Sequence, residues 1–102
     1  MAKVELHVFS EDGSVERVVK RNFISTALWA KYSKLLVDAL SGNEEQVTAA
    51  NESLKPFVLD LFPDLTSDEY DNKVDHAEIQ DLLVAVYARA NNFEIPESVK
   101  NA

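Results

Sequence analysis

A chain of 102 residues is the length of one domain, and a hydrophobic content of 46% is sufficient for a packed core. The absence of cysteine excludes disulfides and thiolate metal sites, and the net charge of −8 disfavours nucleic acid as a partner. No apolar run approaches the roughly 18 residues that a membrane span requires. We therefore expect one domain over residues 1–92, with neither a membrane nor a nucleic-acid partner, and a loosely ordered C-terminal tail over 93–102.

The N-terminal segment, about 3–20, predicts a β-hairpin. Val4, Leu6 and Val8 alternate with polar residues, a period of two that is typical of a half-buried strand. Valines return after the turn-forming run at 11–14. Because two strands are marginally stable in water, the apolar side of the hairpin is expected to pack on helices. The hairpin edges offer a route to self-association.

Two helical patterns follow the hairpin. The first covers about 25–40, with Ser25 as its N-cap. The second covers about 44–62 and contains Pro56. Proline removes an amide donor, so either the helix kinks at Pro56 or Ser53 caps a separate short helix, and the kink is the interpretation that we favour.

Two further helices are predicted in the last third of the chain. Thr66 and Glu69 have the spacing of a capping box, which indicates a short helix over about 67–73. A longer amphipathic helix is predicted over about 76–91. Its apolar positions fall at helical spacing: Ile79, Leu82, Leu83, Val86, Tyr87 and Ala90. The sequence thus predicts an α+β fold, mainly α, in which the hairpin precedes a bundle of three to four helices.

The residue types that carry catalysis or metal binding are sparse. The segment 64–81 holds seven carboxylates, but Tyr70 occupies the position where a calcium-binding loop needs glycine. These acids are better explained as helix caps. His7 and His76 lie in different predicted elements, and two glycines are too few for a phosphate-binding loop. We expect no enzymatic activity, no metal and no cofactor.

Large apolar side chains are the remaining candidates for a functional site. Most belong to the core of so small a domain, but a few stand where burial is least assured. Trp29 flanks the apolar side of the first predicted helix, which also carries Tyr32 and Leu36. Tyr70 lies in the acidic short helix and Phe93 in the tail. These five residues are the predicted partner-binding positions.

The order of the predicted elements resembles a known protein family. After the hairpin come Asn22-Phe23-Ile24-Ser25, then Leu54 to Phe62, then Leu65 to Tyr70, and then the amphipathic helix that contains Glu78 to Leu83. Over residues 22–92 this arrangement resembles the tail assembly chaperones of long-tailed (siphovirus-type) bacteriophages, which are small acidic proteins of similar length. No single chemical motif carries the resemblance, since it consists of apolar patterning.

The resemblance implies a function in viral morphogenesis. Such a chaperone binds the tape measure protein, keeps it soluble and helps to recruit subunits of the major tail (tube) protein. It would work in the host cytoplasm and be absent from the mature virion. The sequence leaves an alternative open, in which the protein is a small acidic inhibitor or immunity-type protein whose 64–81 surface masks a basic site on a target.

Overall fold

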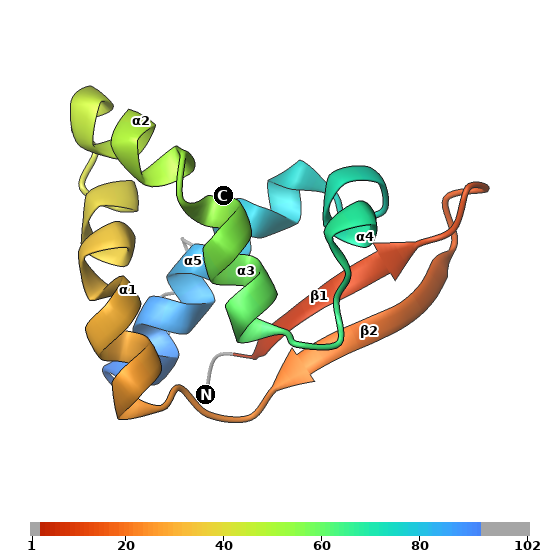
Figure 1. The fold of residues 1–102 in the computed structure, drawn as a ribbon, viewed down its shortest axis with the longest axis horizontal. Helices are drawn as coiled ribbons and strands as arrows, with labels where there is room; N and C mark the ends of the chain where they lie inside the picture. Colours follow the sequence, from red (N-terminus) through yellow and green to blue (C-terminus); the bar gives the residue numbers. More distant parts are fainter. Residues whose placement is uncertain (1–2, 93–102) are drawn as a thin grey trace.

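The computed structural model describes residues 3–92 and places an antiparallel hairpin ahead of five helices in that range (Figure 1). This architecture confirms the predicted α+β, mainly α, fold. Phe93 and the predicted tail over 93–102 lie outside the described residues.

The hairpin pairs β1 (Val4–Phe9) with β2 (Val15–Arg21). Leu6 lies opposite Val19 in this register, and both side chains are buried. The register is interrupted between Val8 and Phe9 by a bulge that leaves Glu16 without a partner on β1. One side of the hairpin therefore faces the core, as the period of two predicts.

The turn between the strands is held by its own side chains. Gly13 has a φ of +87°, a conformation that residues with a Cβ rarely adopt. The Asp12 carboxylate accepts hydrogen bonds from the hydroxyls of Ser10 and Ser14 and from the Ser14 amide, which lowers the pKa of Asp12 to about 2. These bonds fix the connection that sets the strand register.

Helix α1 (Thr26–Ala39) begins where the sequence predicts. The Ser25 hydroxyl accepts a hydrogen bond from the Leu28 amide at 3.1 Å and so satisfies a donor of the first helical turn. Beyond the last turn, Gly42 has a φ of +78°, which turns the chain towards the next helix.

The predicted helix over 44–62 is two helices, so the favoured interpretation of a kink at Pro56 is wrong and the alternative holds. Helix α2 (Glu44–Asn51) ends before Ser53, and α3 (Leu54–Leu61) begins directly after it. Pro56 is the third residue of α3, where the amide that proline lacks would have no partner within the helix. Ser53 occupies the N-cap position of α3 without making a side-chain capping bond.

The last two helices are capped as predicted. Thr66 and Glu69 form the complete capping box of α4 (Ser67–Asn72). Asp75 caps α5 (His76–Ala90) by accepting a hydrogen bond from the Ala77 amide at 2.9 Å. Caps of this kind contribute about 1 kcal/mol each.

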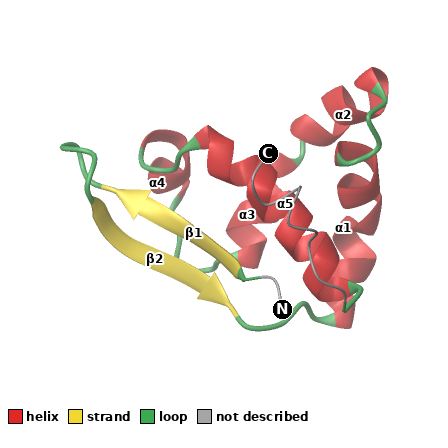
Figure 2. Cartoon of the chain, turned by 180° about the vertical axis from the view of Figure 1, so that it is seen from behind, coloured by secondary structure: helices red, strands yellow, loops and turns green. Residues whose placement is uncertain are grey.

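The core lies between the hairpin and the helices, which gather on one side of it (Figure 2). Helix α5 packs on β1, and α1 packs on both α2 and α5. The largest fully buried side chains come from five different elements or connections: Leu6, Leu36, Phe57, Leu61, Phe62, Ile79 and Leu83. Among residues 3–92, every helix is too short or too polar to cross a membrane.

Candidate partner-binding face

One side of α1 carries no charge, and all of its residues except the half-buried Ser33 are exposed. Its members are spaced alternately by four and three residues, which is the period of a stripe that faces another helix. We call this stripe the outer face of α1, and it consists of Thr26, Ala30, Ser33, Val37 and Leu40. Leu40 is the C-cap residue of the helix and the others are helical. Figure 1 shows α1 at the edge of the molecule, on the side opposite the turn of the hairpin.

Val37 and Leu40 are the apolar part of this face. Val37 is 50% exposed and Leu40 is 40% exposed, although both are residue types that usually lie inside a small domain. On a helix of 3.6 residues per turn, Val37 lies opposite the stripe that packs into the core. The structure therefore leaves a branched apolar side chain where a polar one is expected.

Tyr32 and Leu36, two of the five predicted partner-binding residues, lie in the core instead. The Tyr32 ring meets Phe57 edge-on, with 5.0 Å between ring centroids, and its hydroxyl donates to the Asp60 carboxylate. Burial raises the pKa of Tyr32, and the bond from Tyr32 lowers the pKa of Asp60. Both predicted side chains are used within the fold, so neither is presented to a partner in this structure.

Trp29 and Tyr70 are partly buried against the core. The Trp29 ring packs on Tyr87 of α5, with 5.9 Å between centroids. Tyr70 lies under the Lys55 ammonium, and burial raises the pKa of its hydroxyl. The two residues belong to α1 and α4, which lie at opposite ends of the helical part of the molecule (Figure 1). The structure therefore does not bring them into one site.

Sequence reasoning missed Val37 and Leu40. The signal for Val37 is an apolar residue on the side of the helix opposite a clear core stripe, where solubility favours polar residues. Leu40 carries no such signal, because it follows the buried Leu36 by four residues and is the C-cap of the helix. Phe23, in the connection before α1, is also apolar and 60% exposed, with the Arg21 guanidinium 5.6 Å from its ring centroid.

Most carboxylates of segment 64–81 already have partners within the chain. Glu69 completes the α4 capping box and accepts from Arg17, which together lower the pKa of its carboxyl. Asp71 pairs with Lys55 at 2.9 Å. Three others also accept hydrogen bonds, Asp68 from Asn72, Asp75 from the α5 backbone and Glu78 from His7. Five of the seven acids thus have partners within the fold. Two of them, Glu69 and Asp75, belong to helix caps as the sequence predicts, and the other three pair with side chains.

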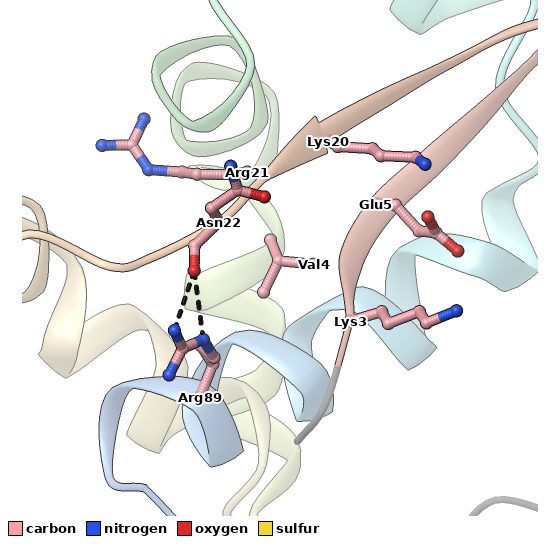
Figure 3. Close-up of a pocket in the computed structure, with 7 residues that line it drawn as sticks. All are labelled: Lys3, Val4, Glu5, Lys20, Arg21, Asn22 and Arg89. Atoms are coloured by element: carbon pink, nitrogen blue, oxygen red, sulfur yellow. Dashed lines mark hydrogen bonds between the residues drawn. The ribbon is translucent and has the colours of Figure 1, made fainter.

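A cavity of about 340 Å³ lies where the strand ends meet the end of α5 (Figure 3). Four of its seven lining residues are basic, and they are Lys3, Lys20, Arg21 and Arg89. The Arg89 guanidinium donates two hydrogen bonds to the Asn22 carbonyl, and Arg21 donates to the carbonyls of Phe23 and Leu61. Both arginines therefore hold elements of the fold together at this cavity.

Within residues 3–92, no three acidic or histidine side chains are grouped closely enough to hold a metal ion. Comparison of the chain with models of protein families, with curated proteins and with solved structures finds no match.

Proposed function

We propose that this protein is a tail assembly chaperone of the kind used by long-tailed bacteriophages. In this proposal it binds helical segments of the tape measure protein in the host cytoplasm, keeps them soluble, helps to recruit tail tube subunits and is absent from the mature virion. The observation that carries the proposal is the outer face of α1, a largely exposed and uncharged stripe with helix-pairing spacing.

The composition of this face suits reversible binding. A fully buried valine or leucine contributes about 1.5–3 kcal/mol, and only Val37 and Leu40 are large apolar residues on the face. Thr26, Ala30 and Ser33 are small enough to let the backbone of a second helix approach closely. Such a contact excludes water from an apolar client segment without holding the client permanently, as an assembly factor requires.

The charge of the remaining surface is compatible with the same function. The net charge of −8 favours solubility while the apolar face stays available. Lys31 and Asp38 lie on another side of α1, whereas Lys34 borders the outer face between Ala30 and Val37. Lys31 is paired with Asp60 and Lys34 with Asp38, and no residue of the stripe itself is charged.

The alternative of an acidic inhibitor gains no specific support. Such a protein needs carboxylates that are available to a basic target, whereas five of the seven acids in segment 64–81 have partners within the chain. A basic target that bound these acids would break their bonds within the chain, and this would lower the stability of the fold.

The proposal is tested by co-expression with a tape measure protein from a neighbouring gene. We expect the wild-type chain to raise the soluble yield of the tape measure protein and to co-purify with it. Val37→Glu should abolish co-purification, because a carboxylate in an apolar helix–helix contact loses its hydration without a partner.

Val15→Glu is the matched control, since Val15 is 49% exposed against 50% for Val37 but lies in β2, away from α1. It should leave co-purification unchanged. If both variants bind like wild type, the outer face of α1 is not the client site, and if wild type neither binds nor solubilises the tape measure protein, the proposed function fails.

A further inference from the structure

The outward edge of β2 is open. The Ser10 amide donates across the turn to Ser14, whereas the next amide along β1, that of Phe9, donates away from β2 to the Lys73 carbonyl at 2.8 Å. Peptide groups alternate in direction along a strand, so the peptide groups of Leu6, three residues before Phe9, point towards β2. Those of its partner Val19 point towards β1. The peptide groups of Val18 and Lys20 therefore point away from β1.

No strand among the described residues pairs with that edge, although the end of α3 and the connection after it accept side-chain hydrogen bonds from Arg21 and Arg17 of β2. Among residues 3–92, no backbone group outside the hairpin bonds to the peptide groups of Val18 or Lys20. Figure 2 shows β2 at the outer rim, with no helix beyond it. The Val18 side chain is 37% exposed, and Glu16 and Lys20 are exposed on either side of it.

The edge of β1 is different. The Lys73 carbonyl accepts from Phe9, and the His7 ring lies 2.5 Å from the Glu78 carboxylate of α5. The connection before α5 and the first turn of α5 thus occupy this side of the hairpin. Among the described residues the peptide groups of Glu5 and His7 likewise have no backbone partner outside the hairpin, but α5 packs against β1, so β2 is the edge that is open to another strand.

We propose that β2 pairs antiparallel with β2 of a second copy of this chain, on a two-fold axis at Val18. In this register Val18 faces Val18 of the second copy, and Glu16 faces Lys20 of the second copy. The symmetry repeats the opposite-charge pair on both sides of the axis. The product is a four-stranded sheet whose outer edges are both β1.

The charged side chains of β2 favour this register over those with the two-fold axis at an adjacent residue. A two-fold axis at Val19 places Arg17 opposite Arg21 of the second copy, and an axis at Lys20 places two lysines opposite each other. Like charges directly opposite one another destabilise a sheet. The axis at Val18 is the one that pairs an acid with a base on each side.

The ends of the pairing are limited by the chain itself. Glu16 is the bulge residue without a β1 partner, and its contact with Lys73 is long, at 3.5 Å, between partly exposed side chains. Its carboxylate can therefore turn to a base on a second copy at little cost. Because the bulge interrupts the regular strand at Glu16, the backbone pairing is short, and Glu16 meets Lys20 of the second copy through its side chain.

Disulfide trapping tests the register, because the chain has no cysteine of its own. Val18→Cys should form a cross-linked dimer on mild oxidation, since facing residues lie about 5.5 Å apart at Cα, within disulfide range. Val15→Cys is the control, as it is similarly exposed in the same strand but would lie about 20 Å from its own copy in this register. Equal cross-linking of the two variants would overturn the proposal.

Charge reversal tests it without cysteines. Glu16→Lys and Lys20→Glu should each raise the dimer Kd about tenfold or more, since two symmetric pairs become repulsive. The double variant should restore wild-type association. Sedimentation velocity over a range of protein concentrations measures this, with circular dichroism to show that each variant is folded.

The inference is contradicted if the wild-type chain stays monomeric at every concentration. It is also contradicted if neither single charge reversal changes the dimer Kd. Association that depends on Val37→Glu instead would place the dimer contact on α1 and contradict it equally. The pairing does not rest on the proposed chaperone function, because its edge lies on the hairpin, away from the outer face of α1 (Figure 1).

Discussion

Helices α1 and α5 have nearly the same length, 14 and 15 residues, and both begin at a side-chain cap, yet they meet their surroundings differently. From Leu82 to Ala90 every residue of α5 is at least partly buried, because the helix packs on β1 and on α1. By contrast, α1 keeps an uncharged side in contact with solvent along its whole length.

The difference shows which part of a helical pattern carries functional information. The apolar stripe identifies the core side in both helices and says nothing about partners. The composition of the opposite side distinguishes them. Where it is exposed, α5 has polar residues such as His76, Gln80 and Asp81, whereas α1 exposes Val37 beside Lys31 and Lys34. In the proposed function, the exposed Val37 side of α1 is the part that would contact the client.

The largest effect that separates the two helices is on stability. Leu83→Ala in α5 removes a side chain that is 1% exposed and should lower the free energy of unfolding by about 2–5 kcal/mol. Val37→Ala in α1 should change it by less than about 0.5 kcal/mol, since half of that side chain is already in water. Urea unfolding followed by circular dichroism measures both. A cost above 2 kcal/mol for Val37→Ala would show that α1 has no free side.

Local rules predicted most of the fold. The caps at Ser25, Thr66 and Asp75 were predictable because a side chain and an amide a few residues away are enough to form them. The break between α2 and α3 was not, because Pro56 fits the first turn of a new helix and a kink equally well. Packing of Leu54 and Phe57 into the core favours the separate helix, and that packing involves distant residues.

The candidate site was harder to predict for the same reason. Tyr32 and Leu36 share a helix with Val37, and their spacing alone assigns them to a stripe without saying what covers it. The covering residues, such as Phe57, come from another helix. The Tyr32 ring therefore suggested a contact with a partner protein, whereas in the fold it contacts Phe57 of the same chain.

A smaller effect separates the core role of Tyr32 from a role in binding. Tyr32→Phe keeps the ring on Phe57 and removes only the hydroxyl that donates to Asp60, so it should cost about 0.5–1.5 kcal/mol of stability. Asp60 keeps its pair with Lys31. Co-purification with the tape measure protein should be unchanged, in contrast to Val37→Glu. Loss of binding with stability retained would return Tyr32 to the partner-binding residues.

The smallest predicted effect concerns the link between α5 and the hairpin. The hydrogen bond to Glu78 raises the pKa of His7 above its usual value near 6.5, and the charges of Glu78 and Glu5 add to this. A pKa raised by folding means that the folded state binds the proton more tightly than the unfolded chain. The stabilisation is thus fully present below about pH 6.5 and is lost as the pH rises through the folded-state pKa.

Because the His7 side chain is 38% exposed, we expect this contribution to be at most about 1 kcal/mol. NMR titration of the two histidine rings should find His7 above the usual range, and Glu78→Gln should bring it back down. The same substitution should flatten the fall in unfolding free energy between about pH 6 and pH 8. If the His7 titration is identical in the two proteins, the contact does not tie α5 to β1 in solution.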